Sequence, residues 1–120
     1  MKLTEREWTV LNALWETRGA ELGLLVNKLF ENTGWRRNTV LTYLTRMEAK
    51  GLVRIDKENY PHIYYATYDR ESCQQQERQN FLRRVYSGSA GDLIAAFLKE
   101  EPISSEERER LRKLLDDMEV

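Results

Sequence analysis

The chain has 120 residues, of which 41% are hydrophobic and 32% charged, with only two prolines and six glycines. That length suffices for one ordinary domain, or for a small domain of about 60 to 70 residues with a helical appendage. The formal net charge of −1 gives by itself no argument for nucleic-acid binding. No apolar run approaches the roughly 18 residues that a transmembrane helix needs, and the first residues are polar instead of forming a signal-peptide core. We therefore expect a folded, helix-rich, cytoplasmic protein without membrane insertion.

Cysteine and histidine are too scarce to build a metal or catalytic site. Cys73 is the only cysteine and His62 the only histidine. Zinc and copper sites draw several ligands from these residue types, and Cys-His or Ser-His-Asp catalysis would require His62 itself. We expect no enzyme activity, no metal and no cofactor, with Cys73 as a structural or surface thiol.

The first 34 residues carry the signals of two amphipathic helices. Thr4 and Glu7 have the spacing of a capping box, which predicts a helix start, and Gly19 is a plausible left-handed stop. Apolar residues at helical spacing then predict a second helix over about 20–31, ended by the sequence Asn-Thr-Gly at 32–34. The short connection that follows delivers a third helix in the manner of a helix-turn-helix.

The third helix, within residues 35–51, has two differently composed faces. Val40, Leu44 and Met47 form one apolar stripe that must be buried. Ordinary solvated faces mix acids with bases, whereas Glu48 is the only acid here, so the pattern favours a face that meets phosphates and base edges. The candidate DNA-binding residues of this helix are Arg36, Arg37, Asn38, Thr39, Thr42, Tyr43, Arg46 and Lys50.

After residue 51 the hydrophobic period changes from 3.6 to 2. Residues 52–56 and 63–68 are predicted as antiparallel strands around a turn at 57–62, and a hairpin directly after a recognition helix is a wing. Two interpretations of its tip stay open: contact with phosphate or the minor groove, or an ordinary polar hairpin end. The candidate wing contacts are Lys57, Asn59, Tyr60 and His62.

Three further helices are predicted after residue 68. Asp69 can cap a fourth helix that runs to about Tyr86, a fifth ends before Pro102, and Ser104 with Glu107 marks the start of a sixth. Their apolar residues are too few to offset the entropy of ordering about 50 residues. They either pack back on the N-terminal domain or, as we favour, pair with a second copy. The candidate dimer-interface residues are Phe81, Leu82, Val85, Tyr86, Leu93, Ile94, Phe97, Leu98, Leu111, Leu114, Leu115 and Met118.

Charge divides the chain in the same way. Residues 1–68 hold 10 basic and 8 acidic residues, residues 69–120 hold 9 and 12, and residues 36–57 alone hold 6 and 2. The positive charge is therefore local, as a DNA reader requires. The sequence predicts a mainly α (α+β) protein with a winged-helix DNA-binding domain at 1–68 and a helical dimerisation domain at 69–120.

Taken together these residues resemble the penicillinase repressor (BlaI/MecI) family of winged-helix repressors over nearly the whole chain. The resemblance implies a homodimer that binds double-stranded DNA at palindromic operators and represses transcription, with Asn38, Thr39, Thr42 and Arg46 at DNA-facing positions. The matching residues are Glu7, Trp8, Val10, Trp15, Trp35, Thr39, Val40, Thr42, Leu44, Arg46, Met47, Lys50, Gly51, Tyr64, Tyr65, Asn80, Phe81, Val85 and Tyr86.

Three departures from the family pattern bear on function. Leu41 stands where the antibiotic-resistance repressors often have a basic residue, and it either contacts DNA or turns into the core. The family's inactivating cleavage, which involves a membrane-bound sensor protease, matches the Ala96-Phe97 bond, but Ala96 replaces the usual Asn. The C-terminal cysteines of copper-responsive relatives are missing.

A different class of function also fits the sequence. A winged-helix module that binds proteins instead of DNA would use Trp35, Leu41 and Tyr43 as a docking surface.

Overall fold

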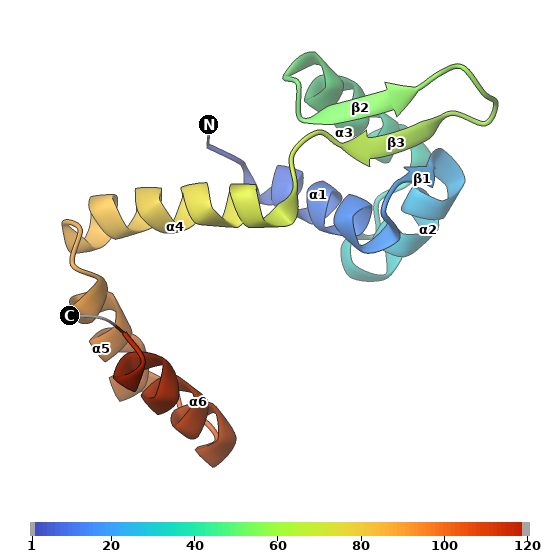
Figure 1. The fold of residues 1–120 in the computed structure, drawn as a ribbon. Helices are drawn as coiled ribbons and strands as arrows, with labels where there is room; N and C mark the ends of the chain where they lie inside the picture. The colour runs from blue at the N-terminus through green and yellow to red at the C-terminus, as the bar shows by residue number, and fades with distance from the viewer. Residues whose placement is uncertain (1, 119–120) are drawn as a thin grey trace. The chain divides into compact units, whose positions relative to one another are not determined.

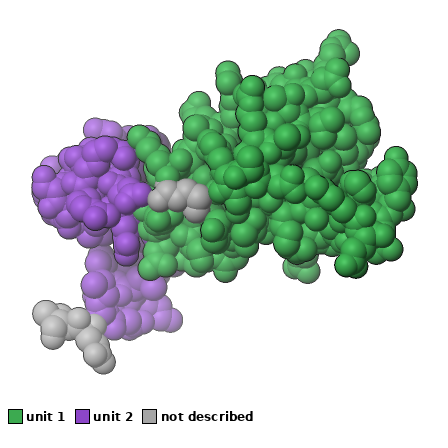
Figure 2. Space-filling model, turned by 90° about the horizontal axis from the view of Figure 1, so that it is seen from above, with its two compact units in different colours: residues 1–77 green, residues 78–120 purple. Residues whose placement is uncertain are grey.

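A computed structural model describes residues 2–118 of the chain. Contacts divide it into two units, residues 1–77 and residues 78–120, coloured separately in Figure 2. The functional boundary after residue 68 stays a prediction. Over the described residues the fold is mainly helical, with a winged helix-turn-helix followed by a helical part, which confirms the predicted fold class (Figure 1).

Helix α1, Glu5–Thr17, begins at the predicted capping box. The Glu7 amide donates to the Thr4 hydroxyl at 3.2 Å, and the Thr4 amide donates to Oε1 of Glu7 at 2.9 Å. The helix ends at Arg18, which adopts the left-handed conformation with φ of 58°, and Gly19 follows with φ of 102°. The helix thus stops one residue before the predicted Gly19, because Arg18 itself takes the left-handed position.

The predicted start of the second helix is wrong. Residues Ala20–Glu21 form a short strand, β1, and helix α2 covers Leu22–Thr33 before Gly34 ends it with φ of 68°. Strand β1 pairs antiparallel with the wing, Ala20 opposite Tyr64 and Glu21 opposite Ile63. Sheet hydrogen bonds to a segment more than 40 residues away therefore replace the first turn of helix that local sequence suggested.

Helix α3, Arg37–Ala49, is followed by the predicted wing, strands β2, Val53–Asp56, and β3, Ile63–Ala66. The sheet is antiparallel in the order β1-β3-β2, so β3 is its central strand. In Figure 1 the hairpin extends beyond α3 and β1 as a long loop.

The core lies among α1, α2, α3 and the sheet. The predicted stripe of α3 is fully inside it: Val40 and Leu44 are 0% exposed and Met47 is 2% exposed. Trp15, half-buried, donates its indole N–H to the carbonyl of Tyr68 at 2.9 Å and so ties the end of the wing to α1. The other buried apolar residues of this cluster are Val10, Leu11, Ala13, Leu14, Ala20, Leu25, Leu29, Leu52, Val53 and Tyr64.

Helix α4, Arg70–Tyr86, starts where Asp69 accepts a hydrogen bond from the Ser72 amide at 2.9 Å, as predicted. Helices α5, Ala90–Glu100, and α6, Ser105–Asp116, are capped by the hydroxyls of Ser89 and Ser104. Neither α5 nor α6 has a buried residue within the chain. No helix over residues 2–118 is both long and apolar enough to cross a bilayer.

Candidate nucleic-acid interface

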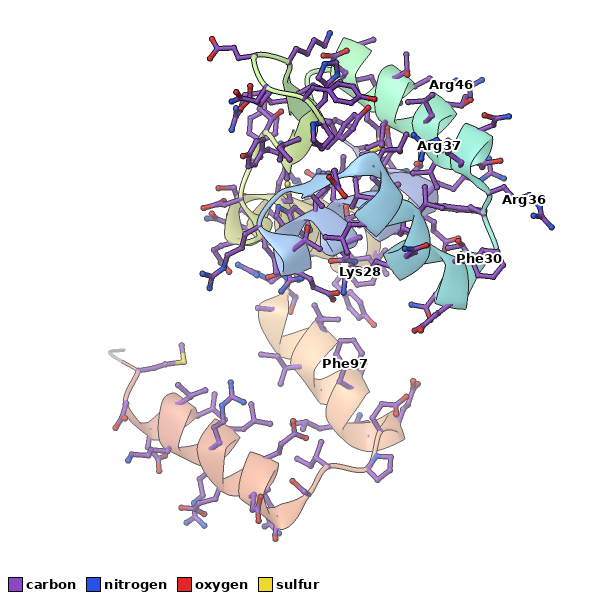
Figure 3. The ribbon with its side chains drawn as sticks, turned by 90° about the vertical axis from the view of Figure 1, so that its right-hand side faces the viewer. Lys28, Phe30, Arg36, Arg37, Arg46 and Phe97 are labelled. Atoms are coloured by element: carbon purple, nitrogen blue, oxygen red, sulfur yellow. The ribbon has the colours of Figure 1, made fainter. Side chains whose placement is uncertain are left out.

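The start of α3 is positively charged, and no acidic side chain or capping hydrogen bond in its first turn balances it. Its N-cap is Arg36, whose side chain makes no capping hydrogen bond, and the first turn has no acid. Amide groups at such a helix start, together with the helix dipole, favour an anion. Figure 3 shows Arg36 and Arg37 at this end of α3 and Arg46 toward the other, and all three side chains are exposed.

The middle of the helix exposes small polar groups. Asn38 and Thr42 are exposed and Thr39 is half-buried. The Thr42 hydroxyl donates to the carbonyl of Asn38 at 2.8 Å, which leaves its oxygen able to accept a further hydrogen bond. Leu41 is 39% exposed and is not part of the buried core, so the alternative that it turns inward is excluded.

Tyr43 makes contacts within the protein that the sequence did not indicate. Its ring meets the Trp35 ring edge-on at a centroid distance of 4.9 Å, and both residues pack against the core. The Arg6 guanidinium lies 5.8 Å from the centroid of the Tyr43 ring. Tyr43 therefore links α3 to α1 and to the residue before α3.

Two of the predicted cations already have acidic partners. The Lys50 ammonium lies 2.8 Å from Oε2 of Glu7, and that of Lys57 lies 3.6 Å from Glu48. Glu7 is buried, which by itself raises its pKa, but hydrogen bonds from Lys50 and from the Thr4 backbone outweigh burial and hold the pKa below its ordinary value. Lys50 thus has a structural role whether or not it also meets a phosphate.

The wing tip approaches the start of α3. Arg37, Tyr60 and His62 line one depression together with the first residues of α2. Tyr60 is 92% exposed, and its ring meets that of half-buried His62 edge-on at 5.8 Å. The predicted wing contacts Lys57 and Asn59 are exposed as well. The start of α3 and the wing tip therefore border the same depression.

Sequence reasoning missed Arg6. It lies on α1, where the pattern of apolar residues indicated only a core helix, and no local motif marks it. Only the fold brings it to α3, where it lines a depression with Tyr43, Arg46 and Lys50.

The predicted dimer-interface residues divide by exposure. Phe81, Leu82, Tyr86 and Leu93 are half-buried within their own chain. The others expose large apolar surfaces, for example Phe97 at 58% and Leu115 at 57%. At the predicted cleavage bond Ala96 is half-buried, and the bond lies inside α5. The remaining exposed members are Val85, Ile94, Leu98, Leu111, Leu114 and Met118.

The potential metal ligands are dispersed over the described residues, and Cys73 is buried. No group of three or more metal-ligating residues occurs among residues 2–118. Cys73 is buried on α4, and burial, with the nearby Asp69 charge, raises the pKa of its thiol. A raised pKa keeps it in the poorly reactive thiol form.

Comparison with known proteins identifies the family. The family model for the penicillinase repressor matches residues 3–117. The methicillin resistance regulatory protein MecI of Staphylococcus aureus strain N315 is 27% identical over 115 residues, covering 96% of this chain and 94% of that protein. The penicillinase repressor of Bacillus licheniformis is 23% identical over 116 residues, 97% of this chain and 91% of that protein. The solved structure of NadR in complex with 4-hydroxyphenylacetate is 20% identical, with a TM-score of 0.48 over 96% of this chain and 73% of that chain. The chain belongs to the penicillinase repressor family.

Proposed function

We propose that the protein is a cytoplasmic, sequence-specific transcriptional repressor that binds a palindromic operator as a homodimer. The observation that carries the proposal is the face of α3, where three exposed arginines accompany exposed Asn38 and Thr42 with no acid in the first turn. Arginine binds phosphates and guanine edges, and Asn binds adenine edges, so this face has the chemistry for both positioning and reading.

The C-terminal unit supports the proposed dimer. Helices α5 and α6 have no buried residue, although their sequence carries a continuous set of large apolar side chains. A surface of that kind is typical of an interface between protein chains. Two copies joined there would carry two recognition helices, which is how a palindrome is read with more discrimination than one helix supplies.

We further propose that proteolysis inactivates the repressor, because the family that the chain resembles is inactivated in this way. Cleavage at Ala96-Phe97 would remove Phe97, Leu98 and all of α6, and with them most of the exposed large apolar side chains of unit 2. The expected consequence is a monomer with weakened operator binding. A chain ending at Ala96 should therefore sediment as a monomer, and a dimer of normal affinity would contradict this route.

The proposal as a whole is tested by DNA retention. Fluorescence anisotropy compares a duplex from upstream of the protein's own gene with a scrambled duplex of equal composition, at two salt concentrations. We expect tighter binding to the upstream duplex and a steep loss of affinity with salt for both. Equal affinities, or binding that ignores salt, would refute sequence-specific recognition.

The alternative of a protein-binding module has less support. It needs Trp35, Leu41 and Tyr43 as an exposed docking surface, but Trp35 and Tyr43 pack on each other and on the core. Only Leu41 of the three is exposed. The salt dependence in the same anisotropy experiment separates the two functions.

A further inference from the structure

A depression of about 440 Å³ lies between the start of α1 and the C-terminal half of α3. Three cations line it, Arg6 from α1 and Arg46 and Lys50 from α3. Glu7 is the one acid among the lining residues, and it is already bonded to Lys50. The two arginines thus leave positive charge that nothing in the lining neutralises.

Aromatic rings hold Arg6 in this position. Its guanidinium lies 5.8 Å from the centroid of the Tyr43 ring, which in turn contacts Trp35 at 4.9 Å, and Trp35 packs against the core. A planar guanidinium over an aromatic face keeps its N–H donors free at the edge. The three residues therefore form one connected set of contacts that presents hydrogen-bond donors beside α3.

We propose that Arg6 binds a backbone phosphate of the operator and that Tyr43 is its positioning residue. The inference rests on the proposed function and adds a DNA contact from α1, outside both α3 and the wing. A phosphate diester fits because it supplies the negative charge that the lining lacks and accepts the donors that Arg6 presents. Arg46, on the same depression, adds to the positive potential there.

The test measures affinity of the full chain for its operator duplex between 50 and 200 mM salt. Removing one phosphate contact with Arg6→Gln should lower the slope of log affinity against log salt by about 0.9. The ratio of the affinity of the unaltered protein to that of Arg6→Gln should accordingly fall about 3.5-fold between 50 and 200 mM salt. Arg6→Lys, which keeps the charge, should retain most of the slope.

Lys28→Gln is the matched control. It removes the same charge from unit 1, but Lys28 lies on α2 beside Glu16 and far from Arg46 in Figure 3. This variant should leave the slope unchanged. An unaltered slope for Arg6→Gln, or equal changes for the two variants, would overturn the phosphate contact.

The role of Tyr43 is tested by its ring. Tyr43→Leu removes the aromatic face and should lower affinity, and Arg6→Gln should cost less in that background. Tyr43→Phe keeps the aromatic face, so Arg6→Gln should keep its full effect in the Tyr43→Phe background. Thermal unfolding confirms that the variants are folded. A full effect of Arg6→Gln in the Tyr43→Leu background would refute the positioning role. If the unaltered protein shows no specific binding, the proposed function fails. If it binds specifically but Arg6→Gln has the same salt slope as the unaltered protein, only the phosphate contact of Arg6 is refuted.

Discussion

Glu7 joins two parts of unit 1 with its two carboxylate oxygens. Oε1 accepts the Thr4 amide and so starts α1, while Oε2 accepts from the Lys50 ammonium at the end of α3. Glu7 is 7% exposed, so the ion pair is largely shielded from water on the carboxylate side. Removal of one partner of such a pair leaves a buried polar group unsatisfied.

Replacing Glu7 by Gln should lower the free energy of unfolding by about 1 to 3 kcal/mol at neutral pH. The folded pKa of Glu7 lies below the ordinary value of 4.5, so its charge stabilises the fold above that pH. This contribution is lost as the pH falls through the folded pKa. Urea denaturation should therefore show a large difference between the two proteins at pH 6, and the difference should shrink as the pH is lowered below 4.5. A difference independent of pH would contradict the role of the charge.

Arg46 and Lys57 should differ in what they contribute to DNA binding. If Arg46 reads a base, Arg46→Ala should cost roughly 1 to 3 kcal/mol and relax the preference at one operator position. Lys57→Ala should weaken all duplexes alike and lower the salt slope by about one. Affinities for operators with single base-pair changes make the comparison. Equal losses of Arg46→Ala on specific and random DNA would remove Arg46 from the base-reading residues.

At the scale of elements, Gly19 is fixed by the close approach of the wing. It has φ of 102°, and a Cβ added there would overlap the ring of Tyr65. The Arg54 guanidinium lies 4.5 Å from the centroid of the Tyr65 ring. Arg54 on β2 and Tyr65 on β3 are a cross-strand pair. The turn between α1 and β1 and the base of the wing therefore constrain each other.

Gly19→Ala should accordingly destabilise the protein more than Gly51→Ala does. Both glycines have positive φ, which costs about 1 to 2 kcal/mol with a side chain. Gly51 has open space around an added Cβ, whereas at Gly19 the Tyr65 ring must move off Arg54. Overpacking adds about 1 to 3 kcal/mol at Gly19 only. Chemical denaturation measures both variants, and equal losses would show that the ring yields freely.

The elements that the sequence predicts well are those with their signals inside one segment. The Thr4 capping box, the Val40-Leu44-Met47 stripe and the Asp69 cap are all local patterns, and each appears in the structure. Strand β1 is only two residues long and forms because it pairs with β3. A segment that short has no hydrophobic periodicity from which a strand could be predicted.

The candidate interface follows the same division. The near absence of acidic residues over 35–51 predicted the exposed arginines of α3. The partners of Tyr43 and Lys50 were not, because Arg6 and Glu7 come from α1 and only tertiary packing brings them to α3.

For the whole molecule, the two units differ in how their apolar residues are used. Unit 1 has one buried apolar core, whereas α5 and α6 of unit 2 have no buried residue. Exposed apolar surface of this kind is costly in water, and its burial against a second copy would be worth about 25 cal/mol for each Å² removed from solvent. We therefore expect the proposed operator recognition to depend on assembly through α5 and α6.

Phe97→Glu tests that assembly directly. Phe97 is 58% exposed in the single chain, and a carboxylate at a buried dimer contact should cost about 2 kcal/mol or more, roughly a 30-fold weaker dimer. Leu24→Glu is the control, because Leu24 on α2 is 49% exposed but belongs to unit 1. Analytical ultracentrifugation at micromolar concentration should show dimers for the unaltered protein and Leu24→Glu, and monomers for Phe97→Glu. The monomeric variant should bind full and half operators with nearly equal affinity, since it no longer links two recognition helices. An unaltered protein that is itself monomeric would contradict the dimer.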